Sequence, residues 1–265
     1  MINKEIIHFA HANGFPAKSY SKLFFYLEKE FEVNYLELHA HNPKFPINDG
    51  WTRLRDELRE ELEKRYTKPI IGVGHSLGGI LHFLVAVENP ELYRAIVLLD
   101  APVISRLSSF GLWSLKKTNL LNRLALPRST VFRRAFWQSK EEAFEHFSKK
   151  QKFAGFDAGM LRDYVEHGTI EDETGVKLLF APKTESKIYL TIPDNLPSHR
   201  GKLKVPAAYI GGTNSNEGRF ARLGYMQKHF PFDFYTIEGT HLFPFEEPQK
   251  TAETIKKSIH RLLPA

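Results

Sequence analysis

One short segment of this sequence has the residue types and the spacing of a nucleophilic serine site. Residues 74–78 read Gly-His-Ser-Leu-Gly, and a further glycine, Gly79, follows them. Residues 70–74 form an apolar run typical of a strand, and residues 78–89 have the apolar spacing of a helix. A serine on such a sharp strand-to-helix turn needs glycines on both sides, because the backbone is strained and closely packed there. The segment therefore predicts that Ser76 attacks a carbonyl group, beside the backbone N–H groups of a helix N-terminus.

Two other chemistries have partial patterns in the sequence. Residues 72–78 come close to a dinucleotide-binding fingerprint, but Leu77 stands where the third glycine is needed. That fingerprint also normally follows the first strand of a domain, whereas this turn follows the third predicted strand. His39 and His41 form an H-x-H pair that could hold a metal, but no third ligand follows at a recognisable spacing. We therefore expect neither site, and we interpret both histidines as loop residues near the entrance of the active site.

Strand and helix patterns alternate along most of the chain, which is typical of a mostly parallel sheet with crossover helices. The predicted strands cover residues 5–10, 34–38, 70–74, 95–99, 207–210 and 233–237. The predicted helices between them include residues 50–66, 78–89 and 248–263. In open α/β folds, ligands bind at the carboxyl edge of the sheet. We therefore expect an α/β fold with its site at that edge.

These landmarks resemble the α/β-hydrolase superfamily, and the resemblance covers almost the whole chain. Residues 11–16, His-Ala-Asn-Gly-Phe-Pro, follow the first strand in the manner of the His-Gly oxyanion loop of these enzymes, with Ala12 where many relatives have glycine. The resemblance implies an α/β-hydrolase fold, with a mostly parallel central sheet and flanking helices. It also implies an oxyanion hole made by the backbone N–H groups of Asn13 and Leu77.

The resemblance also indicates which of the 12 histidines is the base. In the superfamily the catalytic histidine follows the last strand and precedes a closing helix. Residues 239–248, Gly-Thr-His-Leu-Phe-Pro-Phe-Glu-Glu-Pro, match this Gly-x-His loop, including the acidic residue and the proline that open the last helix. His229 and His260 lie in helical patterns, and we interpret them as surface residues. His241 is therefore the predicted base.

The acid of the triad has two candidates. Most relatives carry an aspartate in a G-x-x-D turn after a late strand, but residues 211–217 here read Gly-Gly-Thr-Asn-Ser-Asn-Glu. A minority of the superfamily takes the acid from the end of the preceding sheet strand, where this chain has Asp100 directly after four apolar residues. We predict Asp100 as the acid and keep Glu217 as the alternative, in which case Asp100 would anchor the strand end or the cap.

A long insert interrupts the alternation of strands and helices. More than a hundred residues separate the predicted strands that end at residue 99 and begin at residue 207, far more than a crossover needs. We predict a core domain of residues 1–102 and 204–265 and an inserted, mainly helical cap of residues 103–203. Its helical patterns cover residues 107–126 and 139–151, and the alternating segments 176–180 and 187–192 resemble a β-hairpin.

Charge and composition limit the partners and the location. Residues 103–204 carry 18 Lys and Arg against 11 Asp and Glu, whereas the rest of the chain carries 19 against 20. This basic segment could face anionic lipid or an anionic substrate, but we favour a solvated basic face over membrane contact. No nucleic-acid module is recognisable, so we expect no nucleic-acid partner. The absence of cysteine, of a signal-peptide pattern and of a membrane-spanning apolar run favours a cytoplasmic location.

The sequence as a whole predicts a serine hydrolase that cleaves a small or medium apolar carboxylic ester through an acyl-enzyme, without a metal or organic cofactor. Aromatic residues of the cap favour an apolar acyl group, although many of them could form the core of the cap itself. A carbon–carbon bond hydrolase or a thioesterase would use the same residues. A receptor-like or non-catalytic ligand-binding member of the superfamily is the alternative from another class. The aromatic residues are Phe110, Trp113, Phe132, Phe136, Trp137, Phe144, Phe147, Phe153 and Phe156.

Overall fold

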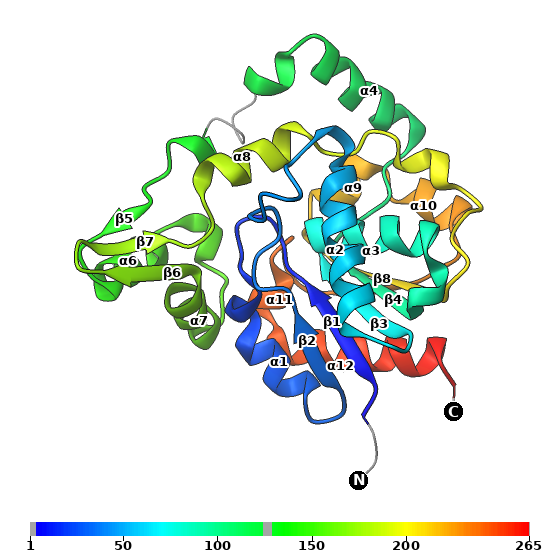
Figure 1. Cartoon of the computed structure of the whole chain (residues 1–265), viewed down its shortest axis with the longest axis horizontal. Coiled ribbons are helices and arrows are strands. Elements are labelled where there is room, and N and C mark those ends of the chain that lie inside the picture. The colour runs from blue at the N-terminus through cyan, green and yellow to red at the C-terminus, as the bar shows by residue number, and fades with distance from the viewer. Residues whose placement is uncertain (1–3, 124–128, 265) are drawn as a thin grey trace.

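The computed structural model describes residues 4–123 and 129–264 (Figure 1). Within these residues, six strands form one sheet in the order β2-β1-β3-β4-β8-β9, and every neighbouring pair is parallel. The predicted α/β-hydrolase architecture is therefore confirmed. The strands are β1 (Ile6–Ala10), β2 (Glu32–Tyr35), β3 (Ile70–His75), β4 (Tyr93–Leu99), β8 (Ala207–Gly212) and β9 (Phe232–Ile237).

Helices cover both faces of this sheet. Because side chains alternate across a strand, Val97 and Leu99 of β4 pack in one apolar cluster with α1 and α12, whereas Ile96 and Leu98 pack in another with α2 and α3. Burial on both faces explains why the central strands read as continuous apolar runs. No helix of the described residues is both long enough and apolar enough to cross a membrane. The helices of the core are α1 (Ser21–Leu27), α2 (Thr52–Arg65), α3 (Leu77–Glu88), α9 (Glu217–Ala221), α10 (Gly224–His229), α11 (Phe243–Glu246) and α12 (Pro248–Leu262).

The insert between β4 and β8 has helices and a small sheet of its own. Figure 1 shows α6, α7 and the strands β5–β7 to one side of the core, and α4 and α8 across its upper end. The small sheet has the order β5-β7-β6 and is antiparallel. Whether residues 103–203 form a separate domain stays a prediction. The elements are α4 (Arg106–Lys117), β5 (Phe136–Trp137), α6 (Lys140–Ser148), α7 (Ala158–Gly168), β6 (Thr169–Asp172), β7 (Gly175–Leu178) and α8 (Pro182–Leu190).

The prediction that residues 176–180 and 187–192 pair as a hairpin is wrong. The strand β7 pairs with β6, which precedes it, and residues 187–190 belong to α8. The turn between β6 and β7 is held by the Asp172 carboxylate, which accepts from Thr174 N at 2.8 Å, and by Gly175 at φ 132°. Pro182 occupies the first turn of α8, where its missing N–H costs nothing. The predicted helix 107–126 is too long, because α4 ends at Lys117 and a separate 3-10 helix covers Leu120–Arg123. Residues 124–126 lie outside the described residues.

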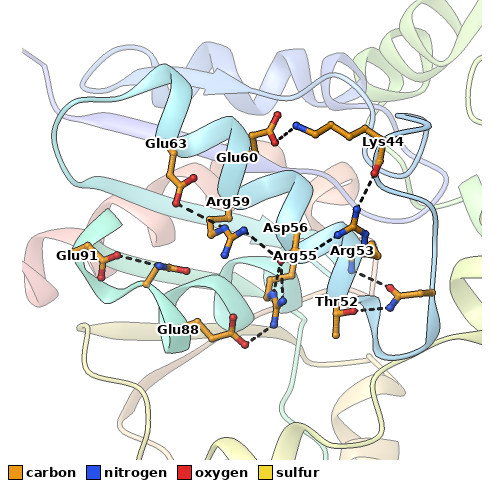
Figure 2. Close-up of polar contacts among 12 residues, drawn as sticks. Lys44, Thr52, Arg53, Arg55, Asp56, Arg59, Glu60, Glu63, Glu88 and Glu91 are labelled. Atoms are coloured by element: carbon orange, nitrogen blue, oxygen red, sulfur yellow. Dashed lines mark hydrogen bonds and ion pairs between the residues drawn. The ribbon is translucent and has the colours of Figure 1, made fainter.

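The solvent face of α2 carries charges that largely neutralise one another (Figure 2). Arg55 lies 2.8 Å from Asp56 and 2.5 Å from Glu88, and Arg59 lies 3.8 Å from Glu63. These side chains are partly exposed, and surface pairs typically contribute about 0–1 kcal/mol each, because water screens them. This face is therefore an ordinary solvated surface.

Candidate active site

The parallel order of the sheet brings the predicted site residues to one edge. Because the strands run in the same direction, the loops that follow their carboxyl ends are neighbours. The loop 11–16 follows β1, Ser76 follows β3, Asp100 follows β4, and His241 lies in the loop after β9. Residues from four separate parts of the chain therefore meet at this edge.

The turn at Ser76 has the strained backbone that the glycine pattern predicts. Ser76 has φ 52° and ψ −112°, in a region that residues with a Cβ rarely adopt. A Cβ at Gly74 would lie 2.4 Å from the carbonyl carbon of Gly78, and one at Gly78 would lie 2.0 Å from the oxygen of Ala10. A Cβ at Gly79 would lie 2.5 Å from the Cβ of Ala101. The glycines are therefore needed for the close approach of α3 to β1 and to the loop after β4.

A chain of hydrogen bonds joins the three predicted triad residues. The ring Nε2 of His241 lies 3.0 Å from Ser76 Oγ, and its Nδ1 lies 2.7 Å from Asp100 Oδ2. Because Nδ1 faces a carboxylate it carries the proton, so Nε2 accepts from the serine hydroxyl. Asp100 is 1% exposed and also accepts from Tyr209 OH at 2.9 Å and from Ser215 Oγ at 2.5 Å. The sequence pattern pointed to neither Tyr209 nor Ser215.

The alternative acid, Glu217, lies farther from the histidine. Its Oε2 is 3.8 Å from His241 Nδ1, and 43% of its side chain is exposed. Ser215 Oγ lies 2.9 Å from the same oxygen, but its single proton is nearer Asp100 Oδ2, so Ser215 lies between the two carboxylates and donates mainly to Asp100. The structure thus places Asp100, and not Glu217, within hydrogen-bond distance of His241.

The electrostatics of the pair favour a charged carboxylate and a basic imidazole. Burial alone would raise the pKa of Asp100, but hydrogen bonds from His241, Ser215 and Tyr209 outweigh it and hold the pKa below its usual value. Burial alone would lower the pKa of His241, but the hydrogen bond to Asp100 and the negative charges of Glu217 and Asp100 raise it above 6.5.

A buried histidine and a tyrosine connect the three loops of the site, and the sequence pattern did not indicate this role. His75 Nε2 lies 2.9 Å from the backbone oxygen of His241, and Tyr20 OH lies 2.8 Å from His75 Nδ1. Tyr20 OH also accepts from Ala12 N at 3.2 Å. Burial lowers the pKa of His75 to about 3, so the ring stays neutral and donates from Nε2 to the carbonyl. His75 and Tyr20 therefore hold the elbow, the histidine loop and the loop 11–16 in register.

The histidine loop itself fits against β8 only because of glycines. A Cβ at Gly212 would lie 2.4 Å from the oxygen of Thr240, and one at Gly239 would lie 2.5 Å from Glu246 Oε2. Glu246 accepts from Thr240 N at 2.8 Å, which fixes the residue before His241. The glycine and the acidic residue of the loop motif thus each have a structural role.

The two predicted oxyanion-hole residues come from adjacent segments. Leu77 is the first residue of α3, where backbone N–H groups have no partner within the helix. Asn13 is buried, and its Nδ2 donates to the Glu185 backbone oxygen at 3.0 Å. Gly78 N donates to the His11 oxygen at 3.2 Å, which joins the start of α3 to the loop 11–16.

His39 and His41 have structural contacts. His39 is buried, and its backbone N donates to His11 Nε2 at 2.8 Å. His41 Nε2 accepts from Ala181 N at 3.3 Å, at the start of α8. Among the described residues, a metal ion could in principle bind between Asp100, Glu217 and His241. Each offers one possible ligand atom, and these atoms lie within 4.8 Å of one another. Since His241 Nδ1 and Asp100 already bond each other, this cluster fits a hydrogen-bonded triad better than a metal site.

Six of the nine aromatic residues of the insert divide into two groups, and Phe136, Phe144 and Phe156 are partly exposed. Trp137, Phe147 and Phe153 are buried in the cluster that includes Phe15 and Phe245 of the core. In contrast, Phe110, Trp113 and Phe132 are 63%, 46% and 81% exposed. These six therefore do not form a common apolar pocket.

Comparisons with known proteins agree with this architecture. The alpha/beta hydrolase family profile matches residues 9–254. The Alternaria alternata abhydrolase domain-containing protein AKT2 is 24% identical over 233 residues, covering 73% of this chain and 84% of that protein. Mouse monoglyceride lipase is 30% identical over 97 residues, covering 36% of this chain and 32% of that protein. The crystal structure of E-2-(acetamidomethylene)succinate hydrolase is 16% identical, with a TM-score of 0.75 over 97% of this chain and 91% of that chain. With this fold and this match, the chain belongs to the alpha/beta hydrolase family.

Proposed function

We propose that this protein is a serine hydrolase that cleaves carboxylic esters, with Ser76 as nucleophile, His241 as base and Asp100 as acid. The observation that carries the proposal is the unbroken hydrogen-bond chain from Ser76 Oγ through His241 to Asp100. Family membership supports hydrolysis in general, and the geometry supports the individual roles. Glu217 modulates the charge around His241 rather than orienting its ring.

The proposed reaction has two halves. His241 Nε2 takes the proton of Ser76 as Oγ bonds to the ester carbonyl carbon, and Asp100 stabilises the imidazolium that forms. The carbon–oxygen bond to the alcohol then breaks, and the alcohol leaves with the proton from His241. Water, deprotonated by the same ring, attacks the acyl-enzyme and releases the carboxylic acid and free Ser76. The backbone N–H groups of Asn13 and Leu77 are proposed to stabilise the oxyanion, and losing one such donor typically costs about 10²–10³ in rate.

A carboxylic ester is proposed because its hydrolysis requires least beyond these residues. The similarity to monoglyceride lipase, which is confined to part of each chain, supports ester hydrolysis. The buried or exposed positions of the insert's aromatic residues provide little support for the apolar acyl pocket expected from the sequence.

A fluorophosphonate probe and a panel of 4-nitrophenyl esters test the proposal. We expect the pure protein to be labelled stoichiometrically and to hydrolyse short esters, and Ser76→Ala to lose both properties while melting at an unchanged temperature. Labelling that persists in Ser76→Ala would reject Ser76 as the nucleophile. Labelling of the native protein without turnover of any ester or thioester would favour a ligand-binding member of the family.

A further inference from the structure

Three charged residues of the insert lie beside the loop 11–16. The Arg133 guanidinium contacts the Glu185 carboxylate at 2.5 Å, and Glu185 is only 3% exposed. A Cβ at Gly14 would lie 2.8 Å from that carboxyl group, so Glu185 packs directly against the loop. The third residue, Lys152, places its ammonium 4.7 Å from the centre of the Phe15 ring.

Lys152 is exposed to solvent, although protein atoms around its ammonium displace part of the water there. Among the described residues, no carboxylate lies within 4.0 Å of its ammonium. Loss of water lowers the pKa of Lys152, the nearby Arg133 lowers it further, and Glu185 opposes both. The charge of Lys152 also acts to lower the pKa of His241 and of His75, so its electrostatic influence reaches the catalytic histidine.

This cluster differs from the charged surface of α2. On α2 the basic side chains lie among carboxylates that compensate them (Figure 2). Beside the loop 11–16, Arg133 pairs with the Glu185 carboxylate, whereas Lys152 has no such partner among the described residues, which leaves one uncompensated positive charge. A charge that has lost part of its water and has no partner is unfavourable, and binding a monovalent anion would relieve this cost.

We propose that Lys152 and Arg133 form a subsite for a carboxylate carried by the acyl part of the substrate. The inference rests on the proposed function and deepens it, because it names half-esters of dicarboxylic acids as the substrate class. The acyl part is the relevant one because its carbonyl oxygen is proposed to bind at Asn13, next to Gly14 and Phe15. A monoanion matches the single unpaired charge.

A pair of esters with the same chain length provides the test. Mono(4-nitrophenyl) succinate carries a carboxylate, and 4-nitrophenyl butyrate is neutral. The native protein should have the higher kcat/KM for the succinate ester, and Lys152→Met should lower the ratio of the two kcat/KM values at least about tenfold, as expected for loss of a charged contact. Lys152→Arg should restore most of the preference. Lys149→Met is the matched control, because Lys149 is 76% exposed and pairs with Glu145.

The outcomes separate the subsite from the catalytic proposal. If butyrate is hydrolysed in a Ser76-dependent manner but Lys152→Met changes both esters equally, the subsite is rejected and the catalytic proposal stands. If neither ester is turned over and Ser76 is not labelled, the catalytic proposal is rejected, and the subsite that rests on it is rejected with it. A loss of preference in Lys149→Met equal to that in Lys152→Met would also reject the subsite, because it would indicate a general surface-charge effect. Melting temperatures of all variants distinguish loss of binding from loss of folding.

Discussion

The loops at the carboxyl edge of the sheet and the charged part of the insert meet at the loop 11–16, but different interactions hold them in place. The core side is positioned by backbone contacts that only glycine allows and by buried hydrogen bonds such as Tyr20 to His75. The insert side is positioned by the Arg133–Glu185 pair and by the Lys152 ammonium over Phe15.

This difference indicates how the two sides can change. Close contacts at glycines and the hydrogen bonds of a triad require specific residues at specific positions. The packed surroundings can neither admit an added Cβ nor supply a new partner for a buried polar group. Charge complementarity requires only a balance of signs at the same place. The core side is therefore suited to the proposed reaction, and the insert side is suited to the proposed choice of substrate.

The largest effect on the core side is expected for Asp100→Asn. The amide preserves the shape of the carboxyl group but favours the wrong tautomer of His241 and leaves its positive form unsupported, so turnover should fall by about 10⁴. The measurement is steady-state hydrolysis of a 4-nitrophenyl ester, with the melting temperature as a check of folding. A loss of less than tenfold would show that Asp100 is not the acid.

On the insert side, Arg133→Gln should have a large effect on stability and Arg134→Gln a small one. Arg133 is the ion-pair partner of the buried Glu185, so its removal should lower the free energy of unfolding by about 3–5 kcal/mol. Arg134 pairs with Glu142 on the surface, with 44% and 39% of the two side chains exposed, and its removal should change stability by less than about 0.5 kcal/mol. Denaturant unfolding of both variants measures the difference, and equal effects would contradict the assigned contacts.

A moderate effect is expected for Tyr20→Phe. The loss of the hydroxyl leaves the Ala12 N–H and His75 Nδ1 without their buried partner, which should cost about 1–3 kcal/mol of unfolding free energy. Tyr26→Phe in α1 is the control, because Tyr26 is only partly buried and lies outside this network. A similar loss in both variants would indicate a general packing effect instead.

The smallest effect is expected for Glu217→Gln and concerns pH. Turnover requires neutral His241, so activity should be lost as the pH falls through the pKa of this ring, which lies above 6.5. Removing the negative charge 3.8 Å from Nδ1 lowers that pKa, so the acidic limb of the kcat/KM profile should move to lower pH. The plateau rate should stay within a factor of about ten. A loss of several orders of magnitude would instead identify Glu217 as the acid.

Local patterns were sufficient for the parts of the molecule that depend on neighbours in the chain. Most strands, the turn at Ser76 and the histidine loop follow from the residues within a few positions, because glycine spacing and apolar runs act locally. The second strand was predicted at residues 34–38 but lies at Glu32–Tyr35. The hairpin prediction failed because alternation in residues 187–192 is compatible with a helix once Pro182 begins one. The turn at Gly175 was the local signal that identifies the true pair.

Other features depended on contacts between distant residues, and only the tertiary structure decided them. Asp100 and His241 are 141 positions apart, and their 2.7 Å contact follows from the order of β4, β8 and β9 in the sheet. The sequence placed Arg133 and Arg134 in one basic segment, whereas the fold gives the first a buried partner and the second a surface one. Charge along the chain determines the sign of a region, but the distance to a carboxylate and the access of water determine what each charge does.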